Sequence, residues 1–439
     1  MEKRDVVVYS EDYKKLVDAA ALKDKYYEID ERVEEICKEA FKGCDKLEEI
    51  VMPKKLKKID SEAFQGCSSL TKLTLPDSVA RIDGLAFCGC SGLTELTLPN
   101  SVKSIGDGAF AYCSGLTELT LPNCVRVVEA CAFCTCSGLT KLTLPNILIN
   151  IWESAFEGCS GLTELTLPNS VTSIADDAFR GCSGLTELTL SNSLKSIGKY
   201  AFSGCSGLTE LTLPDSLESI GNSAFMGCSG LTELTLPNGL ENIGDSAFFA
   251  CIGLTEQTLP DSLKSIDGSV FSGCSSLTKL ILPNSVRSIG DYAFRGCSGL
   301  TELILPNSVT SIVDGAFAGC SGMTELTLPN SVRSIGDYAF TYCRGLTELT
   351  LPNSITSIGD AAFSECSDLS KITSLAEIPP MCGREVFDGV NKTNCELIVP
   401  EGSVAAYKQA YGWNGFSNIR GFSGVEVTVA DKTRKIVVE

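Results

Sequence analysis

The sequence contains no histidine, and this absence removes several classes of catalytic site. Ser-His-Asp and Cys-His catalysis, histidine zinc sites and the H-E-x-x-H motif all require an imidazole. The phosphate-binding motifs G-x-x-x-x-G-K-[ST] and G-x-G-x-x-G are missing as well. Carboxylate chemistry is still open, but a glycosidase needs two carboxylates in different environments, whereas here the acids recur identically from copy to copy. We therefore expect no enzyme, no cofactor and no catalytic residue.

Positive charge and long apolar segments are also scarce. The 439 residues include 36 Lys and Arg against 55 Asp and Glu, which gives a net charge of -19. This balance argues against nucleic acid or an anionic membrane as partner. Apolar runs of only a few residues predict no membrane insertion. The first ten residues are not typical of a signal peptide, so we expect either an intracellular protein or one whose leader has been removed.

The sequence does contain a strict internal period. Fifteen cysteines, one every 23 residues from Cys44 to Cys366, stand three residues after a phenylalanine, and we call them the cysteine ladder. A period this short and regular indicates one structural unit stacked on itself many times.

One copy, residues 159–181, shows how the unit is built. Its Leu162-x-x-Leu165-x-Leu167 segment is the strand pattern of leucine-rich repeats. The leucines alternate with Glu and Thr, so we expect them to point inward. Pro168 ends the strand, and the Ala-Phe-x-x-Cys segment is too short to form a stable helix by itself.

Stacking such units predicts the fold class: a β-rich, right-handed leucine-rich repeat solenoid with 23-residue coils. We expect a parallel β-sheet on the concave face, short turns or 3₁₀ segments on the convex face, and caps at both ends.

The cysteines allow two interpretations. Neighbouring ladder positions would be within disulfide range, but an odd number cannot pair completely, and thiols are good small buried groups. We favour buried thiols. The segment Cys131-x-x-Cys134-x-Cys136 invites a zinc interpretation, yet Cys136 belongs to the ladder and no second C-x-x-C stands at zinc-ribbon spacing, so we predict no metal site.

The repeated pattern, with Leu-Pro and Ala-Phe-x-x-Cys in step over about residues 27–375, resembles the BspA-like, or treponemal-type, branch of the leucine-rich repeats. The segment from Cys395 to Ile419 resembles the closing segment of bacterial surface proteins of this type. The resemblance implies adhesion and protein binding, with host matrix or plasma proteins or other microbes as partners. It also implies a secreted or cell-surface location and no catalytic residues.

Both ends of the chain depart from the period. We expect an N-terminal helical cap over 1–26, with an amphipathic helix that begins after Ser10, then the solenoid over 27–375. A C-terminal cap over 376–439 should contain a short helix from Ser403 to Tyr411, with Trp413 and Phe416 covering the last coil. The last residues suggest a terminal hairpin.

The outward position at the start of each strand is mostly Glu. Its longest uninterrupted run, which we call the acidic strip, is Glu164, Glu187, Glu210, Glu233 and Glu256. Three interpretations are open: a solvated face that keeps the protein soluble, a docking surface for a basic partner, or loose divalent cation sites between adjacent Glu.

A second candidate is an apolar patch made of Ile147, Ile149 and Trp152, which stand where other copies have polar residues or Gly. These side chains would either form a sticky surface or be buried by local repacking.

We interpret the chain as a monomeric, non-enzymatic protein-binding or adhesion scaffold. The alternative is a cytoplasmic structural or regulatory repeat protein with no adhesive role.

Overall fold

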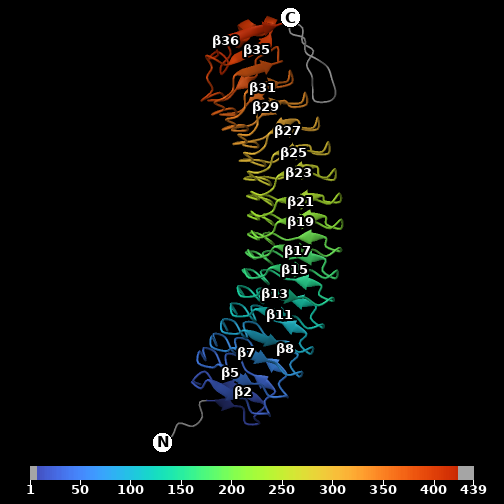
Figure 1. Ribbon diagram of the computed structural model, residues 1–439, viewed down its shortest axis with the longest axis vertical. Helices are drawn as coiled ribbons and strands as arrows, with labels where there is room; N and C mark the ends of the chain where they lie inside the picture. Colours follow the sequence, from blue (N-terminus) through green and yellow to red (C-terminus); the bar gives the residue numbers. More distant parts are fainter. Residues whose placement is uncertain (1–6, 424–439) are drawn as a thin grey trace. The chain divides into compact units, whose positions relative to one another are not determined.

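The computed structural model describes residues 7–423, which divide into two compact units with the boundary after Gly230. In each unit most coils contribute one strand to a long-strand row and one two-residue strand to a short-strand row (Figure 1). Turns connect the rows, and within the described residues helix is confined to 401–407.

The first unit contains twenty of the strands. Its long-strand row is β3 (Tyr26–Glu28), β5 (Glu49–Val51), β7 (Lys72–Thr74), β9 (Glu95–Thr97), β11 (Glu118–Thr120), β13 (Lys141–Thr143), β15 (Glu164–Thr166), β17 (Glu187–Thr189) and β19 (Glu210–Thr212). Its short-strand row is β2 (Lys15–Asp18), β4 (Glu35–Ile36), β6 (Lys58–Ile59), β8 (Arg81–Ile82), β10 (Ser104–Ile105), β12 (Val127–Val128), β14 (Asn150–Ile151), β16 (Ser173–Ile174), β18 (Ser196–Ile197) and β20 (Ser219–Ile220), with β1 (Val8–Tyr9) antiparallel at its end.

The second unit repeats the arrangement. Its long-strand row is β21 (Glu233–Thr235), β23 (Glu256–Thr258), β25 (Lys279–Ile281), β27 (Glu302–Ile304), β29 (Glu325–Thr327), β31 (Glu348–Leu351), β33 (Lys371–Ser374), β35 (Glu396–Pro400) and β36 (Asn418–Phe422). Its short-strand row is β22 (Asn242–Ile243), β24 (Ser265–Ile266), β26 (Ser288–Ile289), β28 (Ser311–Ile312), β30 (Ser334–Ile335), β32 (Ser357–Ile358) and β34 (Met381–Cys382). A 3₁₀ turn, η1 (Glu401–Ser403), leads into α1 (Val404–Tyr407).

The register between coils is the sequence period itself. β15 pairs with β17 in parallel, with Glu164 opposite Glu187 and Leu165 opposite Leu188, which are both offsets of 23 residues. A residue type that recurs in the sequence therefore recurs in space as a straight row. The predicted β-rich repeat solenoid with 23-residue coils is confirmed.

Phenylalanine rings form the centre of each unit. From Phe41 to Phe225 consecutive rings stack with centroids 4.8–5.5 Å apart and planes within 7° of parallel. A second stack runs from Phe248 to Phe387. No single coil encloses its ring, so each coil is stable only against its neighbours.

The ladder cysteines are buried beside these rings as thiols. In the first unit each thiol from Cys67 to Cys228 donates a hydrogen bond to the carbonyl oxygen of the phenylalanine 26 residues earlier, at 3.1–3.4 Å. A sulfur that donates this bond carries a proton, so the interpretation as buried thiols is confirmed for these residues. Burial raises the pKa of Cys136 and Cys228 to about 12, which keeps them protonated and unreactive near neutral pH.

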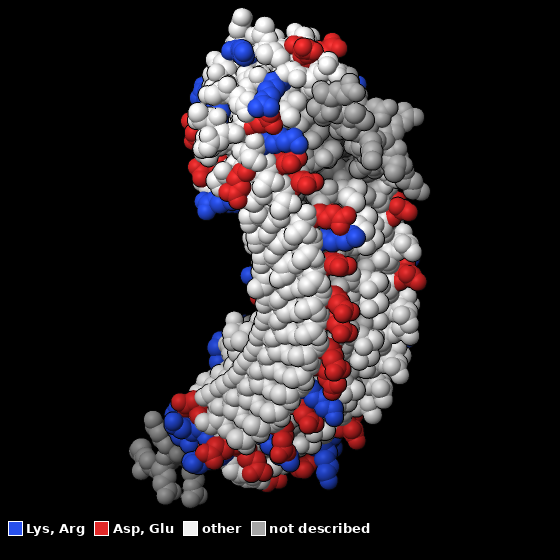
Figure 2. Space-filling view, turned by 45° about the horizontal axis from the view of Figure 1, so that its top comes forward, with Lys and Arg blue, Asp and Glu red and all other residues white. Residues whose placement is uncertain are grey.

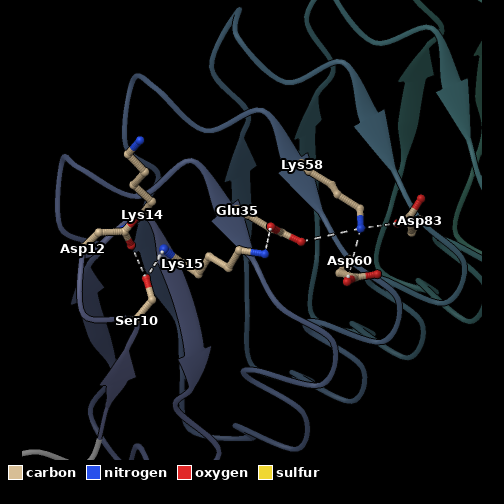
Figure 3. A network of polar contacts seen from close by, with 8 residues as sticks. All are labelled: Ser10, Asp12, Lys14, Lys15, Glu35, Lys58, Asp60 and Asp83. Carbon is tan, nitrogen blue, oxygen red and sulfur yellow. Dashed lines mark hydrogen bonds and ion pairs between the residues drawn. The ribbon is translucent and has the colours of Figure 1, made fainter.

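The N-terminal end is a β-hairpin, and the predicted helix after Ser10 is wrong. The Asp12 carboxylate accepts hydrogen bonds from the Ser10 hydroxyl and the Lys14 amide, which closes a turn between β1 and β2 (Figure 3). Leu16 is fully buried opposite Ile36 of β4. Pairing with the first coil therefore overrides the helical pattern of this segment.

Charged side chains of the short-strand row cross-link these first coils (Figure 3). Glu35 lies 2.8 Å from the Lys15 ammonium and 3.6 Å from that of Lys58, and Lys58 also contacts Asp60 and Asp83 at 3.2 and 3.4 Å. Three of these four ion pairs join two successive coils, and the pair of Lys58 with Asp60 lies within one coil.

The C-terminal end is closed as predicted by Trp413 and Phe416, which lie 5.1 and 5.3 Å from the Phe387 ring. The predicted short helix is present but ends at Tyr407. The predicted terminal hairpin lies outside the described residues. The predicted boundaries 1–26, 27–375 and 376–439 stay predictions, and the division into compact units falls elsewhere, after Gly230.

Candidate protein-binding surface

The long-strand row presents its alternate side chains to solvent. In β15, Glu164 and Thr166 are exposed on either side of buried Leu165, and β17 and β19 repeat the Glu-Leu-Thr sequence. Because the register is fixed, the Glu side chains form one row and the Thr side chains form a second row beside it.

All five residues of the acidic strip occupy the exposed first position of their strands. Glu164, Glu187 and Glu210 belong to the first unit, and Glu233 and Glu256 to the second. Within each unit acidic side chains follow one another in single file (Figure 2). Among residues 7–423, no ion pair involves the three carboxylates of the first unit, so they face solvent with their charge uncompensated.

Lysines interrupt the file, and three of them, Lys72, Lys279 and Lys371, pair with a carboxylate of a neighbouring coil. Lys72 lies 2.9 Å from Glu95, and Lys371 lies 3.1 Å from Glu348. Exposed pairs of this kind stabilise a fold by only about 0.2–1 kcal/mol. Their main effect here is to divide the row into neutralised and uncompensated stretches.

A hollow of about 650 Å³ adjoins the centre of the strip in the first unit. Glu187 and Glu210 line it together with Leu190 and Pro214. At the end of β17 the usual proline is replaced by Ser191, which is fully buried and accepts a hydrogen bond from the Ser193 amide. The hollow thus combines two carboxylates with threonine, asparagine, leucine and proline side chains.

The apolar patch is exposed, and the alternative that local repacking buries it is wrong. The exposed fractions are 40% for Ile147, 38% for Ile149 and 46% for Trp152. Leu148 between them is fully buried, so the coil keeps its core and turns the extra apolar groups outward. The patch follows the short-strand row, whereas the strip lies on the long-strand row, so the structure does not bring them together.

Sequence reasoning missed a second exposed apolar pair. Ile281 of β25 and Ile304 of β27, which we call the isoleucine pair, occupy the outward position that Thr occupies in most coils. They are direct partners in the parallel register and are 40% and 45% exposed. Comparing each copy with the consensus at this position would have found them.

Metal binding has little support in the described part of the chain. No group of three or more Cys, Asp and Glu side chains within residues 7–423 is placed to hold a metal ion. In the Cys131–Cys136 segment, Cys131 is exposed while Cys136 is fully buried. Over the same residues, no helix has the length and apolar character needed to cross a bilayer.

The similarity to known proteins lies in the repeated part of the chain. The family described as "BspA type Leucine rich repeat region (6 copies)" matches in overlapping segments that together span residues 23–394. A leucine-rich repeat protein from Bacteroides ovatus is 32% identical, with a TM-score of 0.72 over 79% of this chain and 93% of that protein.

Two other solved structures are similar at the level of the repeat. The T. pallidum leucine-rich repeat protein is 33% identical over 42% of this chain and 78% of its own, with a TM-score of 0.36. A leucine-rich cell surface protein from Faecalibacterium prausnitzii is 24% identical over 84% of this chain and 92% of its own, with a TM-score of 0.44. No curated protein sequence matches the chain.

Proposed function

This chain belongs to the BspA type leucine-rich repeat family, and from that membership we propose that it is a non-enzymatic scaffold whose long-strand row binds another protein. Repeat solenoids of this kind offer an extended surface in place of a single pocket. The partner is a protein because the exposed groups are regularly spaced carboxylates and hydroxyls, which suit a polypeptide with complementary charges.

The observation that carries the proposal is the pair of uncompensated carboxylates at the first-unit hollow. Glu187 and Glu210 hold the same exposed position in successive coils and have no ion-pair partner among the described residues. Leu190 and Pro214 line the hollow beside them. A row of like charges on a rigid sheet gives an additive field that attracts a basic segment. The apolar groups of Leu190 and Pro214 then offer area that a bound side chain can remove from water.

A random 12-residue peptide library displayed on phage and selected on the full chain tests the binding side. We expect Lys- and Arg-rich peptides whose affinity falls as salt is added. For peptides bound at the hollow, Glu187→Lys/Glu210→Lys should weaken binding about tenfold, since each exposed charge contact contributes up to about 1 kcal/mol.

The matched control is Glu153→Lys/Glu218→Lys, which changes the net charge equally but lies away from the long-strand row. It should leave binding unchanged. If no selected peptide is sensitive to charge reversal anywhere in the acidic strip, the strip only keeps the protein soluble, and Trp152→Gly in the apolar patch becomes the variant to test.

The family resemblance supports a secreted or cell-surface location, with adhesion to host matrix or plasma proteins or to other microbes as the role. A cytoplasmic location is the alternative, and it suits the buried thiols. Antibody labelling of intact cells that express the complete gene separates the two, because a surface protein is labelled without permeabilisation and a cytoplasmic one is not.

A further inference from the structure

The isoleucine pair stands out because it breaks the polar pattern of the long-strand row at two successive coils. Ile281 and Ile304 are in register, so their side chains form one continuous apolar area that is nearly half exposed. Thr258, the partner of Ile281 on its other side, restores the polar consensus.

Two hollows adjoin this pair, both within the second unit. One of about 500 Å³ is lined by Ile281, Leu259 and Pro283, and one of about 660 Å³ is lined by Ile304, Leu303 and Pro306. Each hollow therefore has isoleucine, leucine and proline side chains in its lining, beside polar and acidic ones. An apolar side chain that entered either hollow against the isoleucine would remove part of its surface from water.

The rim of the hollows is acidic. Glu256 and Asp261 line the smaller hollow, and Glu302 and Glu325 line the larger one. The nearby cation is Lys279, which is ion-paired with Glu302 at 3.7 Å. An apolar centre with a negatively charged rim selects a partner that carries an apolar side chain beside positive charge.

We propose that the isoleucine pair is the anchor of a docking site for a basic segment of another protein, one that places a Leu, Ile, Phe or Trp side chain next to Lys or Arg. This proposal rests on the proposed function, since it takes the long-strand row as the binding side. A second copy of this chain does not fit, because its net charge of -19 would oppose the acidic rim.

Peptides selected from the random 12-residue library on the full chain test the anchor. We expect one class of selected peptides to combine a large apolar residue with neighbouring Lys or Arg. For this class, Ile281→Thr/Ile304→Thr should weaken binding at least about tenfold, as expected for losing buried apolar area from two side chains. The fold should survive, because Thr is the residue that other coils carry at this position.

Two further variants sharpen the test. Thr258→Ile extends the apolar row by one coil and should strengthen binding of the same peptides about threefold, as expected for a modest gain in buried area. Thr166→Ile adds the same side chain to the first unit and should have no effect on them.

The results distinguish a failure of the isoleucine anchor from a failure of the long-strand row as the binding surface. If some peptides are sensitive to charge reversal in the acidic strip but none to the isoleucine variant, the anchor is wrong and the proposed function stands. If none responds to either change, both fail. Concentration-dependent dimerisation in sedimentation that Ile281→Thr/Ile304→Thr abolishes would also overturn the proposal, because the occupant would be a second copy.

Discussion

At the scale of single residues, the ladder position needs a small apolar side chain that can also donate a hydrogen bond. Each phenylalanine carbonyl in the turns already accepts a bond from the cysteine amide of its own coil, as Phe179 does from Cys182. The thiol of the next coil, Cys205 in this case, donates to the same oxygen at 3.4 Å. Alanine would leave out that bond and serine would bury a more polar group, which explains why cysteine recurs.

Gln257 is the residue that fits its surroundings least. It occupies a leucine position, is 4% exposed and lies opposite Leu280. Its amide nitrogen donates to the Thr258 carbonyl at 2.8 Å, but its Oε1 atom has no partner. A buried unsatisfied oxygen costs about 1–3 kcal/mol. Gln257→Leu should therefore raise the free energy of unfolding by about that amount, measured from the urea midpoint.

The reverse change provides the control. Leu280→Gln places an amide at the equivalent buried position of the next coil and should lower the midpoint. A Gln257→Leu variant that unfolds at lower urea would show that the oxygen is satisfied by an internal water.

At the scale of the element, each coil depends on left-handed backbone at the corner before the ladder cysteine. Glycine occupies this corner in most coils, with φ of +71° at Gly181 and +74° at Gly204. A Cβ at Gly181 would meet its nearest atom at 3.7 Å, so the preference is conformational and not steric. Thr135 and Ala250 hold the same conformation with φ of 58° and 56°.

These exceptions should store strain. Thr135→Gly removes a β-branched residue from left-handed backbone. We expect it to raise the free energy of unfolding by about 0.5–1 kcal/mol after the entropy cost of glycine. Gly181→Ala should lower the free energy of unfolding by a similar amount. Thermal unfolding of the two variants checks both signs, and a Thr135→Gly protein less stable than wild type would show that the threonine side chain contributes more than its backbone costs.

At the scale of the whole molecule, the ladder thiols each contribute to stability, and their contributions add up. The dependence of stability on pH shows this best. Burial raises the pKa of Cys136, Cys228, Cys274 and Cys343 to about 12, and that of other ladder thiols also rises. A thiol in an unfolded chain titrates near pH 8.5–9. Above that pH the unfolded state loses protons that the folded state keeps, so stability falls as pH rises.

We therefore expect stability to change little between pH 7 and 8 and to fall steeply from about pH 9, by about 1.4 kcal/mol per pH unit for each thiol involved. Urea midpoints under reducing conditions measure the decline. Cys182→Ser/Cys205→Ser should start from lower stability but show a shallower decline, since two titrating groups are gone. A midpoint that stays constant to pH 10.5 would contradict the prediction.

Periodicity alone predicts the regular part of this fold. A 23-residue period without insertions sets the register of the strand pairs inside the repeat, as the pairing of Glu164 with Glu187 shows. It also places Leu165 inward and Glu164 outward. These predictions succeeded because identical coils stack in register. No other arrangement buries the apolar side chains of all copies together.

Where the period ends, or where one copy differs from the rest, contacts with neighbouring coils determine the structure. The segment after Ser10 has helical spacing, but pairing of Leu16 with Ile36 makes it a strand. The exposure of Ile281 and Ile304 depends equally on neighbours, because an apolar residue at an outward position is either covered by the adjacent coil or left in solvent. The local sequence pattern determines whether a side chain points inward or outward. Contacts with other coils determine whether it is buried or exposed there.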